Sequence, residues 1–294
     1  MTQTASPSTP APGIARFLGL PANARVGVVP VIAVVMLAMI VLVTLLAPVL
    51  APHDPLALSP LNRLKPSSAE FPLGTDVFGR DLLSRVLYGG QVSLLIGLGT
   101  AAISVAAGLC IGLVAGFFRI ADALIMRVMD AFMAIPPVLL AVALVAVHGA
   151  SVFSVVLAIT FSEVPRVVRL VRSIVLSARE EPYVEAAIAL GTRMPVILWR
   201  HLMPNTLAPL IVQATYICAS AILIEAILSF LGLGIGTETP SWGNIMAEGR
   251  TYFLLKPSLI FWPGLVLSLC VLSINILGDT ARDMLDPRMR KREA

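Results

Sequence analysis

Residues 28–50 have the sequence VVPVIAVVMLAMIVLVTLLAPVL, a run of 23 residues without a charged side chain. About 20 apolar residues in an α-helix are enough to cross the hydrocarbon core of a bilayer, which is about 30 Å thick. A cleaved signal peptide would have a shorter apolar region followed by a cleavage site between small residues, and we find neither. This run therefore predicts a first transmembrane helix.

The rest of the chain continues the same pattern. Hydrophobic residues make up 57% of the 294 positions and charged residues only 13%, against about 45–50% and 25% in soluble domains. This composition excludes a soluble enzyme, a disordered chain and a disulfide scaffold. Backbone that crosses lipid must satisfy its own hydrogen bonds, which helices do. We therefore predict an all-α membrane protein with six transmembrane helices, the other five at 92–117, 131–148, 151–168, 206–233 and 258–278.

The distribution of charge predicts the topology. With the N-terminus in the cytoplasm, 15 of the 21 Lys and Arg residues fall on the cytoplasmic side, and an excess of positive charge inside is typical of membrane proteins. Both termini are therefore expected to be cytoplasmic. The expected organisation is a flexible cytoplasmic tail (1–27), the first transmembrane helix (28–50), an extracytoplasmic segment (51–90), a transmembrane domain (91–283) with a cytoplasmic loop at 166–204, and a cytoplasmic tail (284–294).

Two local patterns predict how the helices pack. Four small residues follow one another at a spacing of four in the second span: Ser104, Gly108, Gly112 and Gly116. This spacing lets two helices approach closely in lipid, and we favour packing within the subunit over a dimer seam. Pro136 and Pro137 predict a kink in the third span, because proline cannot donate to the helical ladder.

The loop at 166–204 is the most charged stretch, and its centre, Glu180–Pro195, has the sequence EEPYVEAAIALGTRMP. Acidic residues before Pro182 suit a helix start, and Gly191 suits a left-handed helix end. Thr192 is expected to cap a second helix, which should bend at Pro204 into the fifth span. The alternative is an ordinary solvated loop.

This loop resembles a known motif. Glu185-Ala186-Ala187, three residues, Gly191 and then His201-Leu202-Met203-Pro204 match the EAA loop of bacterial ABC importer permeases, commonly EAA, three residues, Gly, nine residues and Ile-x-Leu-Pro. His201 and Met203 replace the usual Ile and Leu, and a histidine there is similar to the peptide-transporter branch. Further stretches resemble the C-type permeases of dipeptide and oligopeptide importers: LGTD (73–76), GRDLLSR (79–85), MRVMD (126–130), LSFLGLG (228–234), PSWGN (240–244) and LDPR (285–288).

The resemblance implies a type I ABC importer permease fold and half of a translocation pore in a bacterial inner membrane. The implied partners are a homologous second permease as a heterodimer, two ABC ATPase subunits that bind ATP and magnesium, and an extracytoplasmic substrate-binding protein. Membrane lipid is expected around the chain, with no nucleic acid. Di- or oligopeptides are the implied cargo, with nickel, opines or short glycans as alternatives. The implied ATPase-coupling residues are Tyr183, Glu185, Ala186, Ala187, Gly191, His201 and Pro204.

We expect no catalytic residue, metal site or cofactor in this chain. It contains neither the phosphate loop G-x-x-x-x-G-K-[ST] nor HExxH, and its three histidines fall in or next to different loops. Its three cysteines lie far apart in apolar stretches, which indicates buried thiols.

Polar residues within the spans are candidates for the translocation pathway. Glu225 lies about 20 residues after Asn205 on the fifth span, roughly 30 Å along a helix and so near its outer end. It could line the pathway or an outer gate, or serve as a structural partner for an amide or an arginine. Gln213 and Asn275 could line the pathway, or bond between helices. A secondary transporter or channel would need midplane carboxylates and usually an internal repeat, and we find neither.

Overall fold

A computed structural model describes residues 27–236 and 238–285. The predicted tails, 1–27 and 284–294, lie almost entirely outside this part of the chain. The described residues form no strand apart from one isolated bridge between Thr75 and Asp81, so the prediction of an all-α protein is confirmed. The helices are α2 (Val28–Leu45), α3 (Ala47–Leu50), η1 (Pro60–Asn62), α4 (Leu82–Phe117), α5 (Arg119–Ala134), α6 (Pro137–His148), α7 (Val152–Ala178), α8 (Pro182–Ala189), α9 (Met194–Val196), η2 (Ile197–Leu202), α10 (Met203–Phe230), α11 (Trp242–Gly249), η3 (Arg250–Tyr252) and α12 (Ser258–Leu285).

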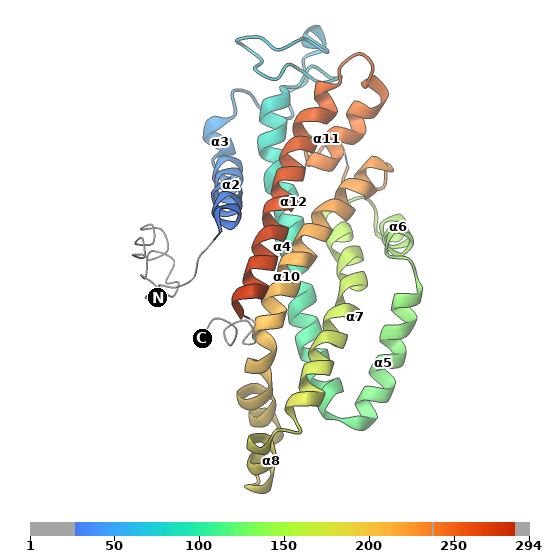
Figure 1. Cartoon of the computed structure of the whole chain (residues 1–294). Helices are drawn as coiled ribbons and strands as arrows, with labels where there is room; N and C mark the ends of the chain where they lie inside the picture. Colours follow the sequence, from blue (N-terminus) through green and yellow to red (C-terminus); the bar gives the residue numbers. More distant parts are fainter. Residues whose placement is uncertain (1–26, 237, 286–294) are drawn as a thin grey trace, which may run out of the picture.

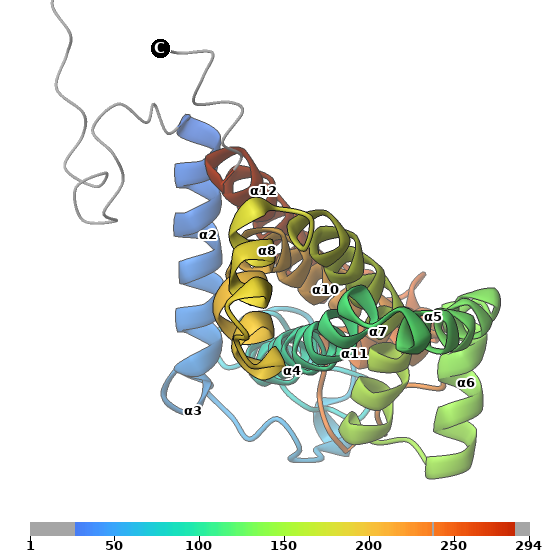
Figure 2. The ribbon, with the colours of Figure 1, turned by 90° about the horizontal axis from the view of Figure 1, so that it is seen from below.

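The long helices form an elongated bundle. Helix α4 packs along α7 and α10, α10 along α12, and α12 along α2. Seen along the bundle, α2 lies on one side and the pair α5–α6 on the opposite side (Figure 2). Helix α8 lies at one end of the bundle, whereas α11 and the segment 51–81 lie at the other (Figure 1). The two ends are therefore separated by the full length of α10.

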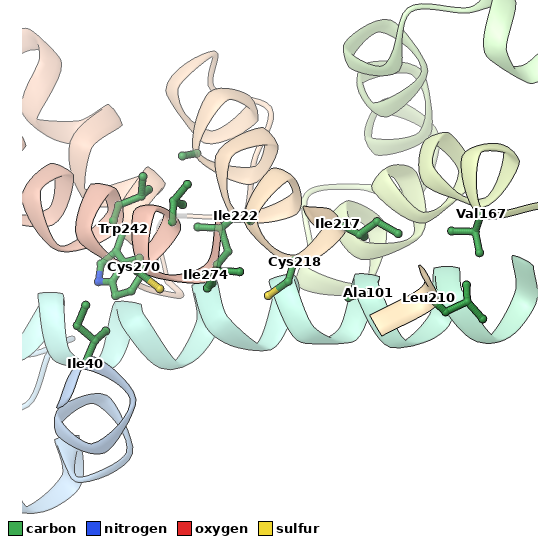
Figure 3. Close-up of a cluster of buried hydrophobic side chains, with 14 of the residues drawn as sticks. Ile40, Ala101, Val167, Leu210, Ile217, Cys218, Ile222, Trp242, Cys270 and Ile274 are labelled. Carbon is green, nitrogen blue, oxygen red and sulfur yellow. The ribbon is translucent and has the colours of Figure 1, made fainter. Parts of the chain in front are cut away.

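The buried core follows α4. Side chains from α7, α10, α11 and α12 are arranged in a row along this helix (Figure 3). The outside of the bundle is also apolar: the 18-residue helix α2 buries only Ala33, Ile40 and Thr44. A helix that is apolar on all sides and mostly unburied must meet lipid or another protein, as a membrane protein requires.

The predicted count of six spans is met only in part. Among the described residues, four helical stretches are long and apolar enough to cross a membrane: α2, α4, the continuous stretch Met194–Phe230, and α12. A fifth results if α5 and α6 are counted together, although they are bent by 90°. Helix α7, which holds the predicted span 151–168, is not among them because it carries several charges, among them Glu163, Arg166 and Arg169.

The third predicted span, 131–148, needs correction. A helix end at Ala134 and a new start at Pro137 divide it, so the predicted kink at the prolines is a full break. The first part, α5, begins as early as Arg119 and pairs with α7 through charge: Arg172 forms two contacts with Asp122, and Arg169 Nη2 lies 2.6 Å from Asp130 Oδ1. These charges satisfy one another on facing helices.

Helix α4 also begins earlier than predicted. Asp81 caps its N-terminus by accepting a hydrogen bond of 2.8 Å from the Ser84 backbone N–H. Ten residues of the helix, 82–91, therefore precede the predicted span at 92–117. The helix ends at Phe117, as predicted.

The small-residue stripe of α4 lies against α7. Cβ atoms built on Gly108, Gly112 and Gly116 would lie 2.4–2.7 Å from the Cβ atoms of three valines spaced four apart, Val167, Val171 and Val175. Ser104, the first member of the stripe, is also buried. The two helices thus approach within this subunit to a distance that only glycine permits.

The glycine contact gives a stability prediction. We expect Gly112→Ala to destabilise the protein by about 1–3 kcal/mol because its methyl group would overlap Val171. The matched control is Gly99→Ala on the same helix, where a Cβ would meet no atom within 4 Å. There, alanine should stabilise the helix by about 0.5–1 kcal/mol relative to glycine. The measurement is thermal unfolding in detergent. Equal melting temperatures for the two variants would contradict the close packing.

Candidate functional site

Helix α8 starts as the sequence predicts. Pro182 occupies the first helical position, after Glu181 in an extended conformation. The Glu181 carbonyl accepts backbone hydrogen bonds from Val184 and Glu185. Glu185, in the first turn, adds negative charge where the helix end is positive. Val184 and Ala187 are buried, whereas Ala186 and Glu185 are exposed.

The end of α8 is fixed by Gly191, whose φ of +73° lies in the left-handed region. The Thr192 N–H donates to the Ala187 carbonyl (3.0 Å) and the Gly191 N–H to the Ile188 carbonyl (2.9 Å). These two bonds form a Schellman motif. The predicted left-handed helix end is confirmed, and it sets the direction in which the chain leaves α8.

The helix after this turn differs from the prediction. Arg193, not Thr192, is the N-cap residue of α9, and it forms no side-chain cap bond. Pro204 does not interrupt the helix, because α9 continues through the π-helical segment η2 into α10 as one helical stretch, Met194–Phe230. Proline lacks an N–H and crowds the preceding turn, and the segment directly before Pro204, Ile197–Leu202, is a local π-helical distortion of the helix.

Helix α8 is attached to the start of α10 by side chains. Asn205 Nδ2 donates to Tyr183 Oη (2.9 Å) and to the His201 carbonyl (2.7 Å). The rings of Tyr183 and His201 lie 6.3 Å apart. An open groove of about 550 Å³ runs beside this contact, between α7, α8 and α10. Tyr183 and Pro204 are exposed, and His201 is half-buried.

The tip of this region presents an apolar surface, which we call the tip surface: Ile188, Leu190, Met194, Val196 and Trp199. Leu190 is 85% exposed and Trp199 60% exposed. The helix α8, which carries part of the tip surface, lies at one end of the bundle (Figure 1). Exposed apolar patches of this kind mark protein or membrane contacts.

The three pathway candidates lie in different environments. Glu225 is fully buried on α10 and bonded to two serine hydroxyls. Gln213 is half-buried on the same helix, 12 residues earlier and so about 18 Å away along the axis. Asn275 is exposed on α12. Gln213 and Glu225 therefore lie apart on one helix, and Asn275 lies on another helix.

A buried ionic network at the opposite end of the bundle was not foreseen from the sequence. Asp76 Oδ2 lies 2.6 Å from Arg80 Nε and 2.5 Å from Arg85 Nη1. Glu248 Oε2 on α11 lies 2.6 Å from Arg80 Nη2 and 2.5 Å from Arg85 Nη1. All four side chains are largely buried. The network connects residues more than 160 positions apart and joins the segment before α4 to α11.

Lys256, just before α12, makes a further contact at this end of the bundle. Its ammonium group donates to the Lys65 carbonyl. Burial lowers the pKa of Lys256, and the charge of Asp76 raises it in part. The segment before α4 is therefore held to the start of α12 as well as to α11.

The comparisons with known proteins match this architecture. Residues 108–291 match the family described as "Binding-protein-dependent transport system inner membrane component". The chain belongs to this family. The permease is 48% identical over 239 residues to a probable peptide ABC transporter permease of Sinorhizobium fredii, covering 81% of this chain and 82% of the relative.

Other relatives and a solved structure agree. The permease is 44% identical over 259 residues to a di/tripeptide transport system permease of Pseudomonas aeruginosa, covering 86% of each chain. Its fold is similar to a chain of the inward-facing MetNI methionine ABC transporter, with a TM-score of 0.56 and 20% identity, covering 70% of this chain and 98% of the other. The expected ABC importer permease fold is confirmed, and the permease is a multi-pass membrane protein.

Proposed function

We propose that this permease forms half of the translocation pore of an ATP-driven importer and is coupled to an ATPase through α8. The observation that carries the proposal is the geometry of α8: a short helix fixed by the Schellman motif at Gly191, with the tip surface exposed beside it. A short rigid helix can pass a rigid-body movement to the helices on either side of it. Here those helices are α7 and α10.

The proposed assembly contains this permease and a homologous second permease as a heterodimer, two ATPase subunits and an extracytoplasmic binding protein. ATP and magnesium would bind to the ATPase subunits, so no catalytic residue is assigned to this chain. The membrane is the bacterial inner membrane, with both termini and α8 on the cytoplasmic side. The orientation is supported by the excess of Lys and Arg on the side predicted to be cytoplasmic. The inner membrane and the binding protein are supported by the description of the family.

The proposed cargo is a di- or oligopeptide. Support comes from relatives named as peptide, di/tripeptide and D,D-dipeptide permeases, at 42–48% identity over most of the chain. The cognate binding protein provides the test by thermal shift against dipeptides, a nickel chelate, an opine and a short glycan. Stabilisation by dipeptides is expected, and stabilisation by the chelate, the opine or the glycan alone would overturn the peptide assignment.

The coupling role gives a prediction for the tip surface. We expect Leu190→Asp to reduce co-purification of the ATPase subunit at least about tenfold, because a charge would be buried in an apolar contact. The matched control is Leu61→Asp, the same change at a residue of η1 that is 94% exposed. The segment that contains η1 lies at the opposite end of the bundle (Figure 1), so ATPase co-purification should not change. Equal ATPase recovery with both variants would contradict docking at α8.

A further inference from the structure

The buried carboxylate of Glu225 connects two helices near the end of the bundle opposite α8. Its Oε1 accepts a hydrogen bond of 2.8 Å from Ser229 Oγ, one turn later on α10. The same oxygen accepts a bond of 2.7 Å from Ser241 Oγ, and Ser241 is the N-cap residue of α11. All three side chains are buried. The side chain of Glu225 is therefore directed towards α11.

The environment explains why a carboxylate occupies this place. The N-terminus of a helix carries a partial positive charge, and Ser241 Oγ also accepts from the Asn244 N–H of the first turn of α11 (3.1 Å). The two helices approach closely here, since a Cβ on Gly243 would lie 2.5 Å from Ala226 Cα. Hydroxyl bonds and close contact thus both join the start of α11 to α10.

Helix α11 also contacts α4 and the segment before it, at the end of the bundle opposite α8. The Trp242 indole N–H donates to the Val86 carbonyl of α4 (3.0 Å). At the other end of α11, Glu248 binds Arg80 and Arg85. A displacement of α11 must therefore displace the segment that carries these arginines.

Helix α10 links this contact to the coupling region. Its helical stretch begins at Met194, three residues after Gly191, and continues without interruption past Glu225 to Phe230. Over this length a helix spans roughly 55 Å. The contact of Glu225 with α11 and the turn after α8 therefore lie towards opposite ends of one continuous helical stretch.

We propose that Glu225 is a positioning residue that fastens α11 to α10, so that a movement received at α8 also moves the outer surface built by α11 and residues 76–85. The inference rests on the proposed coupling of α8 to an ATPase. Because coupling between two sites is reciprocal, a binding protein on the outer surface would act on the ATPase through the same contact.

Two serines provide a matched pair for the test. Ser229→Ala and Ser241→Ala each remove one hydroxyl from Glu225 Oε1, but only the Ser241 bond crosses between helices. Glu225→Leu removes both bonds and leaves the cap of α11 by Ser241 in place, whereas Glu225→Gln keeps an acceptor oxygen. The comparison separates the contact between helices from the cap and from burial alone.

The measurement is amide hydrogen exchange of residues 242–249 in the assembled complex, in lipid nanodiscs, with and without a non-hydrolysable ATP analogue and magnesium. We expect the analogue to change the exchange in the wild type and in the Ser229→Ala and Glu225→Gln variants. The change should be at least about fivefold smaller in Ser241→Ala and Glu225→Leu. The double variant Ser241→Ala/Glu225→Leu should show no larger loss of the exchange response than either single variant, because both substitutions remove the same hydrogen bond between α10 and α11.

The outcomes are distinct. A wild-type response that persists in Glu225→Leu would overturn the role of Glu225, and loss in Ser241→Ala alone would assign the effect to the helix cap. An unchanged α11 in the wild type, in a complex that hydrolyses ATP, would also overturn the inference while leaving the proposed function intact. Failure of the chain to assemble with any ATPase would instead remove the proposed function and, with it, this inference.

Discussion

Replacing Gly191 by valine is expected to lower ATP-dependent uptake of labelled dipeptides into proteoliposomes by about fivefold to thirtyfold. Gly191 has φ +73°, a conformation that costs an L-residue roughly 1–2 kcal/mol and is a genuine outlier for a β-branched side chain. A Cβ at this position would meet no atom within 4 Å. The effect therefore comes from the backbone: valine favours conformations that redirect α8 and displace the tip surface.

The control is Gly191→Asn, since asparagine tolerates the left-handed region. It adds a side chain of similar size in the same open space and should retain uptake within about twofold of the wild type. Neither side chain enters the core, so Gly191→Val should lower the melting temperature only by the few degrees that about 1–2 kcal/mol of backbone strain implies, and Gly191→Asn by less. Equal loss of uptake in the two variants would show that size, and not backbone conformation, matters at this position.

Features set by local backbone chemistry could be predicted from the sequence. The start of α8 at Pro182 and the left-handed Gly191 depend only on residues within one or two turns. The apolar length of α2 similarly needs no partner to be recognised. In each case the residue type itself restricts φ, removes a donor or excludes water, so the structure follows from a short window of sequence.

Features set by contacts between distant segments could not be predicted. Arg80 and Arg85 are visible in the sequence, but their partner Glu248 follows more than 160 residues later. The stripe on α4 predicts a close contact, although only the structure shows that Val167, Val171 and Val175 face it.

Patterns in the local sequence also missed a helix distortion and the pairing of charges on α7. Pro204 gives no sign of the π-helical segment Ile197–Leu202 directly before it, which lies within a helical stretch that continues to Phe230. Helix α7 carries too much charge for a typical span, yet its arginines find acids on α5 and on α7 itself. Such compensation depends on the final packing, which a pattern along the chain does not contain.

The largest loss of stability is expected at Arg85, a fully buried guanidinium that lies between Asp76 and Glu248. The network holds two positive and two negative side chains and is balanced. Arg85→Met leaves Arg80 as the remaining arginine partner of the two carboxylates, and removing one partner from a buried charge pair costs about 3–5 kcal/mol. We expect a fall in melting temperature of about 10 °C in detergent, together with increased proteolysis of the segment before α4.

The same substitution at Arg169 is the matched control. Arg169 and its partner Asp130 are 45% and 58% exposed, and an exposed pair contributes only about 0.2–1 kcal/mol. Arg169→Met should therefore change the melting temperature little. Adding Glu248→Leu to Arg85→Met restores the charge balance by leaving the pair Arg80–Asp76, so the double variant should recover part of the lost stability. Only charge balance predicts that removing a second residue restores stability. If the double variant lost as much stability as Arg85→Met and Glu248→Leu together, lost packing and not uncompensated charge would explain the effect of Arg85→Met.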